Sequence, residues 1–227
     1  MKRDRGTTKD RCSVFGRILL LICTAALVAI LGAGCQTPTP GDDGWYITSL
    51  EDGSWARWRF SETTNNAGET VQFIEDETHT VAIATLDDAV ALFRDFSSYA
   101  ETFGNAEALL IETLGEDMWL VYEFIDNPWP IADSDRVCEI TYQHDEEGVA
   151  VFSFHARPDA YADQGAARQE RYDVSYTFTD LGDGRIEMHE RGKAIPPVDV
   201  PEWLLNSAFP DALFDSLLHI RDTLEQG

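Results

Sequence analysis

The chain has 227 residues, of which 17 are Lys or Arg and 41 are Asp or Glu, so its formal net charge at pH 7 is −24. Six of the basic residues and two of the acidic ones precede Cys35, which leaves a net charge of about −28 on the rest. Such an acidic chain repels nucleic-acid phosphates and anionic headgroups alike. We therefore expect no DNA or RNA partner and no attachment to a membrane by charge.

Residues 1–34 differ from the rest of the chain. A basic stretch is followed by the uncharged, mostly apolar run ILLLICTAALVAILGAG, and this order is typical of an export signal. Gly32, Ala33, Gly34 and Cys35 resemble a bacterial lipobox, although glycine replaces the preferred leucine at position 32. This resemblance predicts lipidation of Cys35. Ordinary cleavage and an uncleaved N-terminal membrane helix are the alternatives, and all three export the domain.

Residues 35–44 are predicted to form a tether. QTPTPGDDG follows Cys35 and offers nothing to bury, and nine residues span at most about 30 Å, so the domain stays near the bilayer. Gln36, rather than aspartate, resembles lipoproteins of the outer membrane, which would face the periplasm in a Gram-negative cell. If Cys35 carries lipid, Cys138 has no partner outside the export signal, so residues 45–227 should be one domain held by core packing.

Past the tether, short β patterns surround one helix. Residues 55–60 and 71–83 are predicted strands, the second interrupted by acidic residues. Thr85 followed by Leu86, Asp87 and Asp88 predicts a helix start, and the helix should run to about Phe96. The further predicted strands are 108–114, 118–124, 137–144, 149–155, 171–180 and 185–191.

Strand alternation predicts which side chains face the core. In RYDVSYTFTD, apolar or aromatic residues alternate with polar ones, which gives the strand one dry face and one wet face. The predicted inward residues of this and the neighbouring strands are Tyr172, Val174, Tyr176, Phe178, Cys138, Ile140, Tyr142, Ala150, Phe152, Phe154, Ile186 and Met188.

The C-terminal segment is predicted to be a long amphipathic helix. Its apolar positions Phe209, Leu213, Leu217, Ile220 and Leu224 step by three or four residues, and Pro210 lies near the start of its main part. An antiparallel sheet followed by one long helix implies that the helix crosses the dry face of the sheet. We expect a cavity there, because neither surface can follow the other everywhere.

Four segments together resemble a known family. PWPIADSDRV, VPEWLLN, FRDFSSYAETFGN and MWLVYEFIDNPWP are similar, in order and spacing, to motifs of START-type lipid-transfer domains, and the likeness covers about residues 45–225. There are departures. Ser134 replaces the arginine expected before Asp135, with Arg136 in the next place, and Thr102 or Phe103 replaces a tryptophan. EMHERGKAIPPVD lacks the family's Asp-Pro-Gly-Gly, so any role of that loop does not carry over.

The resemblance implies an α+β helix-grip fold, in which a curved antiparallel sheet wraps a C-terminal helix around an internal apolar cavity. It also implies a protein that binds or transfers a lipid, a sterol or another apolar small molecule, without catalysis and without a cofactor. The export signal and the lipobox-like Cys35 add the expectation that this protein is exported and tethered to a membrane. Trp129, between two prolines, would then be a rigid structural corner.

Candidate ligand contacts follow from strand and helix positions. Glu190 and His144 continue the inward register of their strands and are the candidates for contacts to a headgroup, whereas the helix residues could equally be plain core. The predicted ligand-contacting residues are Tyr142, Phe152, Phe154, Tyr172, Tyr176, Met188, Glu190, Trp203, Phe209, Leu213 and Leu217.

Other chemistry is disfavoured. His144 should point inward while His155 and His189 point outward, so no metal site is expected. The sequence has no Gly-x-Ser-x-Gly elbow and no phosphate-binding loop, and an inward Cys138 should be inert.

Two rival functions remain open at this stage. One is an enzyme of the polyketide cyclase type that uses Glu190 and His144 as acid and base. The other is a ligand-free interaction module whose tunnel is filled by side chains and whose acidic surface binds a cationic partner.

Overall fold

The computed structural model describes residues 40–127, 131–145, 147–198, 200 and 202–226, and for 202–208 only the course of the backbone. All the described strands and helices belong to one structural unit. The predicted export signal, Cys35, most of the tether and Trp129 lie outside the described residues.

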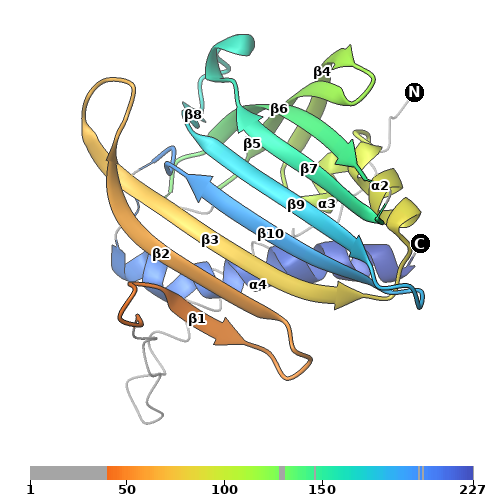
Figure 1. Ribbon diagram of the computed structural model, residues 1–227. Helices are drawn as coiled ribbons and strands as arrows, with labels where there is room; N and C mark the ends of the chain where they lie inside the picture. The colour runs from red at the N-terminus through yellow and green to blue at the C-terminus, as the bar shows by residue number, and fades with distance from the viewer. Residues whose placement is uncertain (1–39, 128–130, 146, 199, 201, 227) are drawn as a thin grey trace, which may run out of the picture. The chain divides into compact units, whose positions relative to one another are not determined.

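Ten strands form one open sheet (Figure 1). The strands are β1 (Tyr46–Ser49), β2 (Trp55–Thr64), β3 (Thr70–Ala82), β4 (Glu107–Gly115), β5 (Met118–Ile125), β6 (Ser134–His144), β7 (Val149–Ala156), β8 (Ala167–Arg168), β9 (Tyr172–Asp180) and β10 (Ile186–Ala194). Their order is β1-β2-β3-β10-β9-β7-β6-β5-β4, with β8 paired to β6. Every pairing is antiparallel except that of β8 with β6, so the predicted antiparallel sheet is confirmed.

The alternation of side chains defines the two faces of the sheet. On β9, Val174, Tyr176 and Phe178 are buried, and on β10, Ile186 and Met188 are buried, as their parity predicts. The inward residues form one core together with residues of the helices. Burying this alternating face against the helices drives the strands into one register.

The helix α2 (Leu86–Arg94) begins at a capping box, as predicted. The Asp88 amide donates to Thr85 Oγ1 at 3.2 Å, and the Thr85 amide donates to Asp88 Oδ2 at 2.9 Å. Phe93 of this helix is fully buried against β7 and β9. The short helix α3 (Tyr99–Thr102) and the one-turn 3₁₀ helix η1 (Pro158–Ala160) were not predicted.

The helix α4 (Glu202–Gln226) crosses the inner face of the sheet and packs against β3 and β2 (Figure 1). Leu217, Ile220 and Leu224 are buried in the core, as their spacing predicts. The helix continues through Pro210, which lies inside it. Together the sheet and this helix give the predicted α+β helix-grip architecture. No helix in the described ranges combines the length and the apolar character needed to cross a bilayer.

The acidic residues that interrupt β3 divide between the two faces. Glu75 and Glu77 point outward, where they form ion pairs with Arg59 at 2.5 Å and with Arg57 at 2.7 Å. Asp76, between them, therefore points inward, toward α4. This placement brings a carboxyl group to the apolar side of the sheet.

Candidate ligand-binding pocket

A pocket of about 270 Å³ lies between the sheet and α4. Its walls come from β3, β9, β10 and α4, with contributions from two loops. The residues lining it are Ile74, Asp76, Thr78, Gln169, Tyr172, Val174, Tyr176, Glu190, Ala194, Pro196, Phe209, Leu213, Ser216, Leu217 and Ile220. Most of these side chains are apolar or aromatic, and the polar ones are few, which is the usual composition of a small-molecule site.

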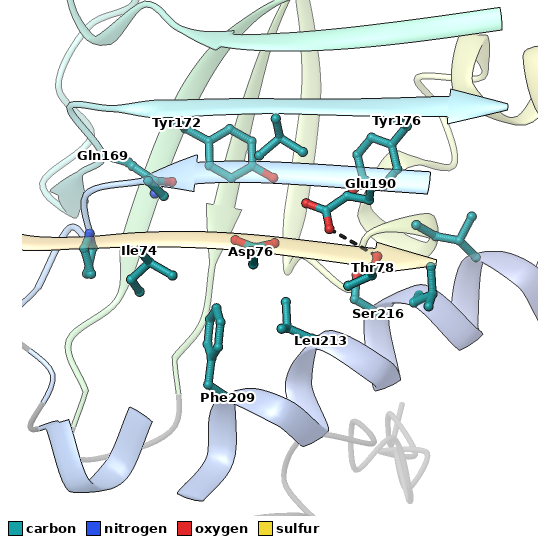
Figure 2. Close-up of a pocket in the computed structure, with 15 residues that line it drawn as sticks. Ile74, Asp76, Thr78, Gln169, Tyr172, Tyr176, Glu190, Phe209, Leu213 and Ser216 are labelled. Atoms are coloured by element: carbon teal, nitrogen blue, oxygen red, sulfur yellow. Dashed lines mark hydrogen bonds between the residues drawn. The ribbon is translucent and has the colours of Figure 1, made fainter. Parts of the chain in front are cut away.

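The helix side of the pocket is apolar. Phe209 and Leu213 point from α4 toward β3 in Figure 2, and Phe209 meets the ring of Phe60 at a centroid distance of 5.9 Å. Ser216 lies one turn further along the helix and is exposed. The pocket is therefore bounded by hydrocarbon on the α4 side and reaches the protein surface beside Ser216.

Two carboxyl groups from neighbouring strands face the pocket (Figure 2). Glu190 on β10 is 7% exposed, and its Oε2 accepts a hydrogen bond of 3.1 Å from Thr78 Oγ1 on β3. Asp76 lies two residues before Thr78, opposite Gly192 of β10. Antiparallel pairing of two adjacent inward positions thus brings the two acids together.

Burial changes the protonation of this pair. Burial, and then the adjacent Asp76 carboxylate, raise the pKa of Glu190 well above its usual range. Burial likewise raises the pKa of Asp76 to about 6, and the outward carboxylate of Glu77 adds to the shift. Two interacting carboxyls titrate as a unit, so near neutral pH the pair holds a shared proton and carries about one negative charge.

A second buried pair, which joins Glu123 of β5 to Arg136 of β6, lies beside the pocket. Arg136 Nε and Nη2 donate to the two oxygens of Glu123 at 2.6 and 3.0 Å, and the Glu123 side chain is fully buried. The Arg136 guanidinium is stacked over the Tyr172 ring, 4.3 Å from its centroid. Burial raises the pKa of the Tyr172 phenol, and the Arg136 charge opposes that shift. Tyr172 therefore separates a neutralised ion pair from the pocket.

The structure brings together some of the predicted ligand contacts and not others. Tyr172, Tyr176, Glu190, Phe209, Leu213 and Leu217 line the pocket. Phe152, Phe154 and Met188 are buried in the core, and Tyr142 packs against that core; none of the four lines the pocket. The side chain of Trp203 lies outside the described residues. Ligand contact by any of these residues remains a prediction.

His144 and Glu190 do not share the pocket. His144 is exposed at the end of β6, and it is not among the pocket-lining residues. Within the described residues no cluster of His, Cys, Asp or Glu could hold a metal ion. Cys138 is fully buried, and burial raises the pKa of its thiol, in agreement with the inert role predicted for it.

The sequence reading missed Asp76, Thr78 and Gln169, three polar residues that line the pocket. Strand alternation could have identified Asp76 and Thr78. The apolar residues Ile74 and Ala82 of β3 face inward, and positions 76 and 78 belong to the same alternating series. Gln169 lies in a loop, where no periodicity applies, and its Nε2 donates to the Ile195 carbonyl.

Asp135, in the segment PWPIADSDRV, is held by Arg168. Asp135 is fully buried, and its two oxygens accept hydrogen bonds from Arg168 Nε at 2.5 Å and Nη2 at 3.1 Å. Arg168 also donates to the carbonyls of Pro158, Tyr161 and Ala162. Asp135 therefore fixes the loop around η1, and none of the described residues 131–137 lines the pocket.

Comparison with known proteins gives matches in structure alone. Neither the family models nor the curated proteins contain a match to the sequence. A STAR-related lipid transfer protein from Xanthomonas axonopodis superimposes with a TM-score of 0.66 at 23% identity, over 80% of this chain and 99% of that one. Human StAR-related lipid transfer protein 5 gives 0.64 at 13% identity, over 92% and 96%. Human STARD10 gives 0.63 at 12% identity, over 80% and 73%.

At these TM-scores the superpositions show a shared fold over most of each chain. The sequence motifs, the strand order and these superpositions agree: the chain has the helix-grip fold of STAR-related lipid-transfer domains.

Proposed function

We propose that this chain is an exported, membrane-tethered protein that binds or transfers a lipid, a sterol or another apolar small molecule in the pocket between the sheet and α4. The observation that carries the proposal is the pocket itself, in which an apolar wall from α4 faces a strand wall with a few polar groups. The structural neighbours include lipid transfer proteins, which supports the same role.

The energetics support such a role. Each methylene moved from water into an apolar site contributes roughly 0.8 kcal/mol, so even a short acyl chain binds without specific contacts. A pocket of about 270 Å³ is close to the lower end of the roughly 300 to 1,000 Å³ usual for ligand sites. It suits a headgroup with part of its chain, and the rest of the chain would extend toward the opening at Ser216.

A carrier is favoured over the two rival functions. The acid and base proposed for a cyclase-type reaction do not meet, because Glu190 lines the pocket and His144 is exposed outside it. The pocket volume argues against an interaction module whose interior is filled by its own side chains.

Binding is tested with the delipidated full chain and a panel of fluorescent fatty acids, sterols and alkylamines. We expect saturable binding of at least one class, weakened at least tenfold by L213W, which fills the pocket. The matched control is A212W, which adds the same side chain at the exposed neighbouring position of α4. Saturable binding of no class would overturn the proposal.

Export and tethering are a separate part of the proposal, and the sequence of residues 1–44 supports them. Expression in a Gram-negative host with labelled palmitate should give a labelled protein in the outer-membrane fraction, and Cys35→Ala should remove the label. An unlabelled periplasmic protein would indicate ordinary cleavage, and an unlabelled membrane protein would indicate a retained anchor. Either result would overturn lipidation.

A further inference from the structure

Glu190 and Asp76 place acidic groups in a pocket whose other walls are largely apolar. None of the pocket-lining residues is Lys, Arg or His, and among the described residues no basic side chain bonds either carboxyl. Glu190 Oε2 accepts a hydrogen bond from Thr78 Oγ1, and the other polar neighbour of its carboxyl is Asp76, which is itself acidic. The buried acidic pair therefore faces the cavity without a cationic partner from the described residues.

The buried cation beside the pocket does not serve as that partner. Arg136 donates two hydrogen bonds to Glu123, and its guanidinium lies behind the ring of Tyr172. Its charge is therefore already balanced. The basic residues near β3 and β10, such as Arg59 and Lys193, pair with Glu75 on the outer face of the sheet. The negative charge of the Asp76–Glu190 pair is left without compensation in an apolar site.

An uncompensated buried charge is costly, and a ligand that brings the opposite charge removes this cost. Phosphate or carboxylate headgroups would add a second negative charge beside the first. A hydroxyl could donate one hydrogen bond, but it would leave the charge unbalanced. A cationic head balances the charge, and an alkylammonium head can in addition donate hydrogen bonds to the carboxyl oxygens.

Two tyrosines complete a site suited to a cation. Tyr172 and Tyr176 line the same pocket; burial raises the pKa values of both phenols, and the nearby Glu190 carboxyl adds to the shift. Tyr176 lies directly opposite Glu190 in the pairing of β9 with β10, and Figure 2 shows both tyrosines on the pocket side of the sheet, as Glu190 is. Aromatic faces attract alkylammonium and quaternary ammonium groups, and more strongly where water is excluded.

We infer that the pocket takes an amphiphile whose polar group is a single cation, an alkylammonium or quaternary ammonium head, and that this head binds at Asp76 and Glu190 while its chain lies against Phe209 and Leu213. The inference rests on the proposed function, and it narrows the ligand from any apolar molecule to a cationic one.

The test uses three ligands that share one chain and differ in the charge of the head: decyltrimethylammonium, decanol and decanoate. Isothermal titration calorimetry with the delipidated full chain at pH 7.5 and 0.15 M salt should give the tightest binding for decyltrimethylammonium. We expect at least a tenfold advantage over decanol, and the weakest binding for decanoate.

Variants distinguish a cation preference that comes from Asp76 and Glu190 from one that comes from the overall negative charge of the protein. The double variant D76N/E190Q should lose the preference for the cation and keep its binding of decanol, which also shows that the pocket is intact. The control E187Q removes one acidic residue from the opposite face of β10 and should keep the preference. E187Q and D76N/E190Q each remove about one negative charge, so a preference that came from the overall negative field would fall by a similar amount in both.

The outcomes distinguish the two proposals. Equal affinities for the three ligands, tightest binding of decanoate, or a preference that survives in D76N/E190Q would overturn the cationic ligand and leave the carrier function standing. Binding of none of the three ligands, together with none of the fluorescent panel, would overturn both.

Discussion

The carboxyl of Asp76 occupies the space that a side chain at position 192 would need. A Cβ added to Gly192 would lie 2.5 Å from Asp76 Oδ1 and 2.8 Å from Oδ2, which is closer than real Cβ contacts approach. Glycine at position 192 of β10 therefore allows an acid on β3 to lie flat against the neighbouring strand. The glycine is required by this close approach, since its backbone is not among those with positive φ.

Gly192→Ala should destabilise the protein by about 1 to 3 kcal/mol, because the added methyl group must displace a short and confined carboxyl. The measurement is urea denaturation followed by tryptophan fluorescence. In the background of Asp76→Ala, the same substitution should cost much less, since the clash is absent. Gly115→Ala on β4 is the control, because its Cβ would meet only Met118 Cβ at an ordinary 3.8 Å. Equal costs in the two backgrounds would contradict the contact.

Asp76→Asn should change how stability depends on pH. The pKa of Asp76 rises from 3.8 to about 6 on folding, so the folded state holds its proton longer than the unfolded state does. Stability therefore falls as pH rises from about 4 to about 6, and the loss persists above that range. The variant lacks this loss, so its free energy of unfolding relative to wild type should improve across the same window by about 1 to 3 kcal/mol.

Urea titrations at pH 4, 5, 6 and 7.5 measure this difference. Asp183→Asn is the control with the opposite sign, because a hydrogen bond from Arg185 lowers the pKa of Asp183. Its relative stability should fall as pH rises through the acidic range. Parallel curves for wild type and Asp76→Asn would contradict the assigned shift.

The alternation of residues on β9 and β10 was enough to predict the inner face of the sheet, including Glu190. Asp76 was not predicted to face inward because it lies between Glu75 and Glu77. Three consecutive acids suggest a solvated segment, unless the alternation of strand residues is continued across them. The outer acids are stabilised by Arg57 and Arg59 across the strand pair, a contact that depends on the register of two strands. The register of β2 against β3 could not be predicted from the sequence of either strand alone.

The sequence predicts a cavity between the sheet and the C-terminal helix, but it does not predict which residues of the helix line that cavity. Helical spacing places Phe209, Leu213 and Leu224 on one stripe, yet the first two line the pocket and the third packs in the core. The difference arises from where α4 crosses the sheet, which the sequence of the helix does not determine. Similarly, Phe152 and Phe154 share the inward face with Tyr176, but that part of the sheet is covered by Phe93 of α2 and by Phe103, which follows α3.

Removal of one partner of the Glu123–Arg136 pair should be strongly destabilising. Arg136→Met leaves a fully buried carboxylate with its remaining hydrogen bond from Asn105, and we expect a cost of about 3 to 5 kcal/mol. Glu123→Leu combined with Arg136→Met removes both charges and should recover much of that loss. A double-mutant cycle by chemical denaturation measures the coupling.

The exposed pair of Arg185 and Asp183 provides the contrast, and Arg185→Met there should have little effect because solvent screens both charges. If Arg136→Met were as mild as Arg185→Met, the buried ion pair would not exist in solution.

Arg168→Lys should loosen the loop around η1 although the positive charge is kept. Arg168 clamps the two oxygens of Asp135 and also donates to three backbone carbonyls, an arrangement that needs the planar fork of a guanidinium. Lysine can satisfy one or two of these acceptors, so we expect the free energy of unfolding to fall by about 1.5 to 3 kcal/mol.

The measurement is amide hydrogen exchange, which should become faster in residues 157–169 and stay unchanged in α2. Arg171→Lys is the control, since the exposed Arg171 donates one side-chain hydrogen bond, to Asp173 at 3.2 Å, and otherwise lies over the ring of Phe73. Unchanged exchange in Arg168→Lys would show that the loop is held by other contacts.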